Sequence, residues 1–119
     1  MLQGLDRVLI ATRNHDKMAD FCRSVLGAEL SPVRVAGHTM YDGTCGPFAW
    51  LLCPAELAGI AAQDACLQLR FVVRDVQQVL ARARRFGALI ESDEVLEDQR
   101  TAGIVRDPDG NAWEFVQNV

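Results

Sequence analysis

The carboxylate of Glu114 has the setting in this sequence that most strongly indicates a chemical role. It lies in the C-terminal segment 106–115, where a proline, a glycine and an asparagine favour a sharp turn and predict a β-hairpin. Because side chains alternate along a strand, Glu114 shares a face with Ala112 and Val116. A carboxylate on a half-buried strand is normally paired, hydrogen-bonded or bound to a metal, so Glu114 is the first candidate for a site.

Composition limits the kind of protein that this chain can be. With 119 residues, half of them hydrophobic and 24% charged, it is expected to fold as a single domain, residues 1–119. A net charge of -4 argues against nucleic-acid binding and against an acidic membrane surface. The longest apolar run, residues 48–54, is far shorter than the roughly 20 residues that span a bilayer. We expect a cytoplasmic protein.

The four cysteines have neither zinc-site nor redox spacing, so they are expected to be free thiols, mostly in the core. They are Cys22, Cys45, Cys53 and Cys66.

The arrangement of predicted elements repeats once along the chain. The first half contains a helix that is capped by Asn14 and ended by Gly27, and the second half contains one between Asp75 and Gly87. Strands are predicted at residues 5–12, 28–35, 38–44, 48–53, 67–74, 88–96, 101–106 and 111–117. Residues 54–64 are expected to connect the halves. Each half therefore has the order strand, helix and three strands, with a period of about 60 residues.

Three segments of the chain resemble the vicinal oxygen chelate superfamily of glyoxalases, bleomycin-resistance proteins and extradiol dioxygenases. They are residues 25–27, which end the first helix, residues 71–75, which open the second half, and residues 107–115. The resemblance implies an α+β fold of two βαβββ modules, about residues 5–54 and 66–118, forming a curled mixed sheet around a cleft. It also implies a homodimer in which both chains contribute to each site.

In metal-using relatives, ligands come from the first strand of each module and from the glutamate after the Asp-Pro-Asp-Gly-Asn turn. The resemblance therefore makes Glu114 a ligand and puts Arg7 and Gln68 at the two first-strand positions. A fourth-strand ligand position falls near Leu51 or Leu52, which cannot coordinate a metal. A guanidinium has no lone pair to donate and repels a cation. If any metal binds, Glu114 and Gln68 are its candidate ligands, but we expect no metal or other cofactor.

The same polar residues suit an organic ligand. Arg7 could pair with Glu114, with Gln68 and Arg70 beside them, and present hydrogen bonds to a small molecule. Trp50 and Tyr41 are candidate aromatic walls of the cleft, together with Trp113. His38 lies beside a turn, where it could act as an acid, a base or a substitute ligand.

Structural roles explain several of these residues equally well. An Arg7–Glu114 pair could do no more than fix strand register. Gln68 could face solvent, and the aromatic side chains could belong to the core.

Three functions remain open from the sequence. We expect a small-molecule-binding protein that acts by sequestration or sensing, and a neutral or anionic organic molecule suits Arg7 better than a cationic one. The alternative is an enzyme, either a metal-dependent lyase, isomerase or dioxygenase acting on vicinal oxygens or a metal-free variant with Glu114 as base. A pure interaction module, using residues 48–52 as an adhesive strand, is the third. The sequence identifies neither the ligand nor a reaction.

Overall fold

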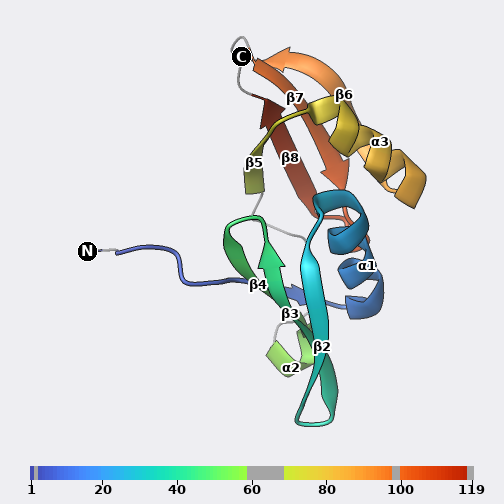
Figure 1. Ribbon diagram of the computed structural model, residues 1–119. Coiled ribbons are helices and arrows are strands. Elements are labelled where there is room, and N and C mark those ends of the chain that lie inside the picture. The colour runs from blue at the N-terminus through green and yellow to red at the C-terminus, as the bar shows by residue number, and fades with distance from the viewer. Residues whose placement is uncertain (2, 59–68, 98–99, 118–119) are drawn as a thin grey trace. The chain divides into compact units, whose positions relative to one another are not determined.

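A computed structural model describes residues 1, 3–58, 69–97 and 100–117 of the chain (Figure 1). The chain divides into two compact units, unit 1 (residues 1–63) and unit 2 (residues 64–119), and each forms its own four-stranded sheet. No helix in the described residues is long and apolar enough to cross a membrane. The predicted α+β fold with two βαβββ modules is confirmed.

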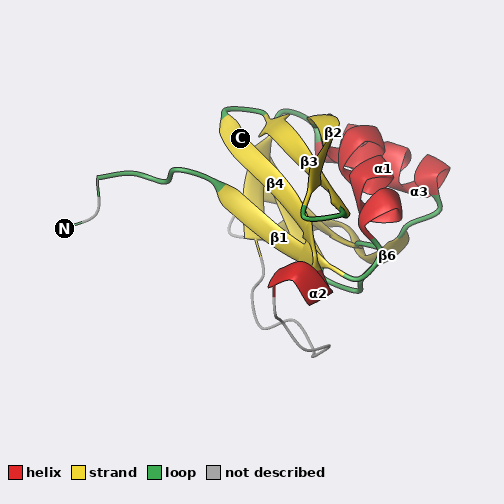
Figure 2. Cartoon of the chain, turned by 90° about the horizontal axis from the view of Figure 1, so that it is seen from below, coloured by secondary structure: helices red, strands yellow, loops and turns green. Residues whose placement is uncertain are grey.

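Unit 1 contains a mixed sheet with the strand order β1-β4-β3-β2. Strand β1 is parallel to β4, and the other neighbours are antiparallel, as the strands side by side in Figure 2 illustrate. The elements of this unit are β1 (Val8–Thr12), α1 (His15–Leu26), β2 (Glu29–Val35), β3 (His38–Cys45), β4 (Phe48–Pro54) and α2 (Ala55–Ala58).

Helix α1 packs its apolar side against one face of this sheet. Its buried residues are Met18, Ala19, Phe21, Cys22 and Val25. Opposite them, the sheet buries Trp50 and Leu52 completely. The helix ends where predicted, because Gly27 adopts a left-handed conformation at φ 72°. At its start, however, the Asn14 side chain makes no capping bond, and the Asn14 N–H instead donates to Thr12 Oγ1 at 3.1 Å.

Unit 2 repeats the plan with the strand order β5-β8-β7-β6. Helix α3 contacts β6, β7 and β8. Here the predicted cap is confirmed, since Asp75 accepts a hydrogen bond from the Gln78 N–H at 3.3 Å, and Gly87 ends the helix at φ 89°. The elements are β5 (Leu69–Val73), α3 (Val76–Phe86), β6 (Leu89–Glu97), β7 (Arg100–Arg106) and β8 (Ala112–Gln117).

Predicted and observed elements differ mainly at their ends. The first strand begins at Val8 rather than at residue 5, because its parallel ladder with β4 starts at the Val8–Trp50 pair. Helix α2 was not predicted, as residues 54–64 were expected to be a connection. The predicted free thiols are confirmed for Cys22, Cys45 and Cys53, whereas Cys66 lies outside the described residues. Burial raises the pKa of the Cys45 thiol.

The turn between β2 and β3 holds a strained residue at the tip of a projecting hairpin. Strand β4 pairs with β3 only from Tyr41 onward, so the tip extends beyond β4 (Figure 1). Ala36 has φ 51° and Gly37 has φ 79°, as a turn with two left-handed central residues requires. The Arg34 guanidinium holds this turn closed by donating to the Gly37 carbonyl at 2.8 Å and to Thr39 Oγ1 at 2.7 Å.

Replacing Ala36 should therefore change stability according to the tolerance of the new residue for positive φ. We expect Ala36→Asn to raise the free energy of unfolding by about 0.5–1 kcal/mol, because asparagine adopts the left-handed region more readily than alanine. Urea denaturation of the purified variant measures the change. Ala36→Val is the matched control, and its β-branch should lower the free energy by about 1 kcal/mol or more. Equal stability of the two variants would contradict the assignment of strain to this turn.

Candidate functional site

Glu114 lies in the middle of the sheet of unit 2, on the face opposite α3. The other face is the one that α3 covers: a Cβ added to Gly103 would lie 3.2 Å from Leu80 of the helix, and Gly103 is paired with Phe115. Because side chains alternate, Glu114 projects from the opposite face, as predicted. The residue is only 6% exposed.

The carboxylate of Glu114 is paired with an arginine of the neighbouring strand. Arg70 of β5 lies directly opposite Glu114 in the parallel ladder, and its Nε donates to Glu114 Oε1 at 2.5 Å. The Arg70 side chain is 43% exposed, whereas that of Glu114 is 8% exposed. This charge-assisted hydrogen bond offsets the free-energy cost of removing the carboxylate from water. The predicted pair between Arg7 and Glu114 would join two different units and stays a prediction.

Arg7 lies in unit 1, just before β1, where its guanidinium is 3.7 Å from the carboxylate of Asp42. Asp42 is on β3, two strands from β1, so the Arg7 side chain reaches across β4. Both side chains are almost half exposed, at 43% and 45%. Asp42 is paired with Leu51, and Leu51 with Leu9, which places these three residues on one face of the sheet.

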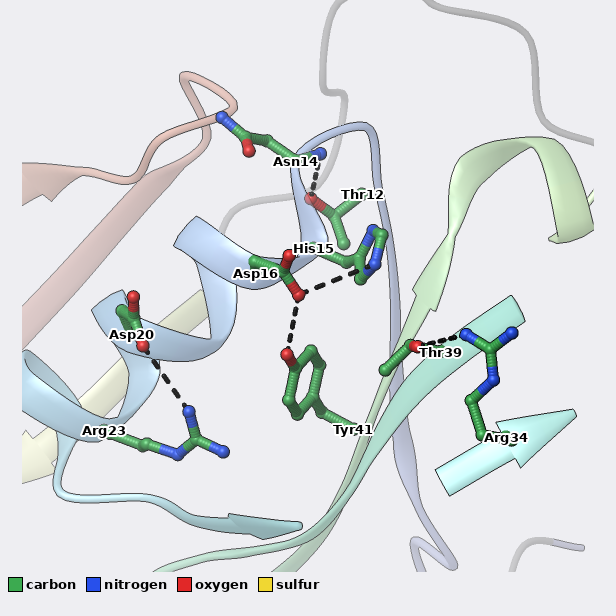
Figure 3. Close-up of polar contacts among 9 residues, drawn as sticks. All are labelled: Thr12, Asn14, His15, Asp16, Asp20, Arg23, Arg34, Thr39 and Tyr41. Atoms are coloured by element: carbon green, nitrogen blue, oxygen red, sulfur yellow. Dashed lines mark hydrogen bonds and ion pairs between the residues drawn. The ribbon is translucent and has the colours of Figure 1, made fainter. Parts of the chain in front are cut away.

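Two of the three predicted aromatic walls, Tyr41 and Trp50, lie on the other face of this sheet, against α1. Tyr41 donates a hydrogen bond from its hydroxyl to Asp16 of the helix at 2.6 Å, and the Arg23 guanidinium lies 5.2 Å from its ring centre (Figure 3). Trp50 shares the face of Tyr41, because Tyr41 pairs with Leu52 and Trp50 is two residues away. The indole of Trp50 is completely buried within the core of unit 1.

The structure thus divides the predicted site residues of unit 1 between two faces. Alternation along β3 puts His38 on the face of Asp42, at the hairpin end of the strand, where it is half-buried. We call this surface, opposite α1, the helix-free face of unit 1. Gln68, the remaining predicted site residue, lies outside the described residues. Within the described part of the chain, no group of three or more histidine, cysteine, aspartate or glutamate side chains could hold a metal ion.

A family comparison identifies the fold that carries these groups. The sequence model of the Glyoxalase/Bleomycin resistance protein/Dioxygenase superfamily matches residues 4–115. The chain belongs to this superfamily. No curated protein matches it.

Several solved structures share the fold of this chain at low sequence identity. The fosfomycin resistance protein FosX from Listeria monocytogenes is 14% identical, with a TM-score of 0.80 and coverage of 100% of this chain and 96% of that one. TnmS3 from Streptomyces sp. CB03234, an antibiotic binding protein, is 16% identical, with a TM-score of 0.78 and coverage of 99% and 98%. TioX from Micromonospora sp. ML1 is 23% identical, with a TM-score of 0.75 and coverage of 98% and 100%.

Asp107 carries a second buried carboxylate, which was not predicted from the sequence. Its Oδ1 accepts hydrogen bonds from the backbone N–H groups of Asp109 and Asn111, both at 2.9 Å. Its Oδ2 accepts from Asn111 Nδ2 at 2.9 Å and from the indole Nε1 of Trp113 at 2.7 Å. Asp107 therefore fixes both the turn and the start of β8, the strand that carries Glu114. Its position before Pro-Asp-Gly was the available signal, because aspartate at the first position of a turn bonds the backbone two residues later.

Removing the negative charge of Asp107 should strongly destabilise the protein. In Asp107→Asn the new amide N–H₂ faces donors that it cannot satisfy, so we expect the free energy of unfolding to fall by about 2–3 kcal/mol. Asp75→Asn is the control: Asp75 is exposed, its side chain accepts one hydrogen bond, and asparagine caps a helix equally well, so a change of less than about 0.5 kcal/mol is expected. Urea denaturation measures the free energy of unfolding of both variants. Equal values would show that the four hydrogen bonds of Asp107 do not stabilise the fold.

The hydroxyl of Tyr41 should ionise only at strongly alkaline pH. Its hydrogen bond to Asp16, followed by burial, raises the pKa of Tyr41 above its usual value of 10.0. The chain contains a single tyrosine, so the absorbance of tyrosinate during a pH titration reports this group alone. Asp16→Asn should lower the pKa toward 10.0, whereas Asp20→Asn should change it less, because Asp20 acts only through a weaker long-range repulsion. A wild-type pKa at or below 10.0 would contradict the hydrogen bond.

Proposed function

We propose that the protein binds a small organic molecule without a catalytic metal and acts by sequestering or sensing it, as a homodimer in the cytoplasm. The observation that carries this proposal is the Arg70–Glu114 ion pair. Superfamily resemblance makes Glu114 the expected metal ligand, yet its Oε1 already accepts the Nε–H of Arg70. A divalent cation at this carboxylate would have to displace the guanidinium or lie beside its positive charge.

Arg7 supports the same proposal from the other module. It occupies the position where metal-using relatives offer a ligand, and its guanidinium carries no lone pair for a cation. The chemistry of Arg7 and of the Arg70–Glu114 pair thus supports binding without a catalytic metal. Of the similar structures, TnmS3 is an antibiotic binding protein, and a FosX mutant from Listeria monocytogenes was solved with Mn(II) and dihydroxypropylphosphonic acid. The fold accommodates either mode, so the side chains of this chain decide between them.

Elemental analysis of protein purified without an affinity tag or chelator tests this proposal. We expect the wild type to contain no stoichiometric metal, even after incubation with zinc, nickel, manganese or iron. The variant Arg70→His replaces the cation with an imidazole directly opposite Glu114 in the ladder between β5 and β8, so it should take up metal that the wild type does not. Arg13→His is the matched control, because Arg13 is an exposed arginine just after β1, and this variant should remain empty.

Stoichiometric metal in the wild-type protein would overturn the proposal. That result would favour a metal-dependent lyase, isomerase or dioxygenase acting on a substrate with vicinal oxygens, with Glu114 and Gln68 among the ligands.

A further inference from the structure

The helix-free face of unit 1 combines an apolar surface with one loosely paired arginine. Three large apolar side chains of this unit are exposed: Leu9 of β1 to 54%, and Val33 and Val35 of β2 to 42% and 44%. Side chains alternate between the two faces along each strand, and paired residues share a face, so six apolar side chains lie on this one. They are Leu9, Ala11, Val33, Val35, Met40 and Leu51. Exposed apolar side chains gathered on one face indicate a surface that binds something apolar.

The charge at the edge of this surface comes from Arg7. Its guanidinium lies 3.7 Å from Asp42, which is longer than a charge-assisted hydrogen bond, and it makes no hydrogen bond to the part of the chain that is described. The position of Asp42 two strands away keeps the guanidinium above the sheet rather than beside it. Arg7 therefore has donors available next to the apolar surface.

We infer that this face binds an organic acid, with the apolar body of the molecule on Leu9 and Leu51 and its anionic group on Arg7. The inference rests on the proposed function and adds to it the charge and shape of the ligand. A carboxylate or sulfonate accepts two parallel hydrogen bonds from a guanidinium, a better geometry than the contact with Asp42 provides. A neutral molecule of the same shape gains only the apolar contact, so the acidic group supplies the discrimination.

Removal of the Asp42 carboxylate should affect binding of an acid in the opposite direction to removal of Arg7. This carboxylate competes with the acidic group of the ligand for Arg7, so its removal should strengthen binding of an acid. Because both side chains are almost half exposed, this substitution has little effect on folding.

Two fluorescent probes with nearly the same ring system test the inference. Anilinonaphthalene sulfonate carries one negative charge, and phenylnaphthylamine is its uncharged counterpart. Titration of native protein measures the dissociation constant of each probe for the wild type and for Arg7→Gln, Asp42→Asn and Arg13→Gln. Arg13→Gln is the matched control, because it removes the same charge from the other end of β1. Thermal melts verify that each variant is folded.

We expect Arg7→Gln to raise the dissociation constant of the sulfonate about 5- to 20-fold, the loss of one half-exposed charge-assisted contact. Asp42→Asn should lower that constant several-fold, and Arg13→Gln should leave it within about twofold. Binding of phenylnaphthylamine should be the same in all four proteins.

Unchanged sulfonate binding in a folded Arg7→Gln variant would overturn the inference, and so would the failure of both probes to bind the wild type. The first result removes only the recognition of an acid. It leaves the binding of organic molecules in place, and it is thereby distinguishable from stoichiometric metal in the wild type, which removes the proposed function itself.

Discussion

The β7–β8 hairpin depends on interactions that offset the free-energy cost of burying two carboxylates, those of Asp107 and Glu114. Asp107 and Glu114 are both only 6% exposed, and an uncompensated charge at either place would cost several kcal/mol. The two residues meet this cost differently. Asp107 accepts four hydrogen bonds from its own turn and from the indole of Trp113, whereas Glu114 relies on an arginine of the next strand. The first arrangement fixes the backbone of the turn, and the second places an ion pair on the face of the unit 2 sheet that lies opposite α3.

The sequence predicted the features that local chemistry determines. Gly27 and Gly87 end their helices as expected, and the two βαβββ modules follow from a period that is visible without a structure. Arg70 was expected beside Glu114 as a neighbour of an Arg7–Glu114 pair, but its role as the direct partner of Glu114 was not predicted. Arg70 lies opposite Glu114 because of the parallel register between β5 and β8, which brings together residues far apart in the sequence. No local pattern specifies that register.

Face assignment was the second limit of sequence reasoning. Alternation along β3 and β4 separates Tyr41 and Trp50 from Asp42 and Leu51, but it does not say which set meets the helix. The hydrogen bond from Tyr41 to Asp16 decides this question, and it depends on how α1 lies across the sheet. Similarly, the first strand was predicted too long, because Leu5 is apolar but has no partner in the ladder with β4.

Trp50 and Trp113 are the two tryptophans of the chain, and each is buried on the helix-covered face of a different unit. The protein therefore carries one intrinsic fluorophore in each half of its duplicated architecture. With either indole replaced by phenylalanine, the emission of the other follows the denaturation of a single half. Coincident transitions would mean that the two halves unfold as one cooperative unit, and separate transitions would mean that each half is a cooperative unit of its own.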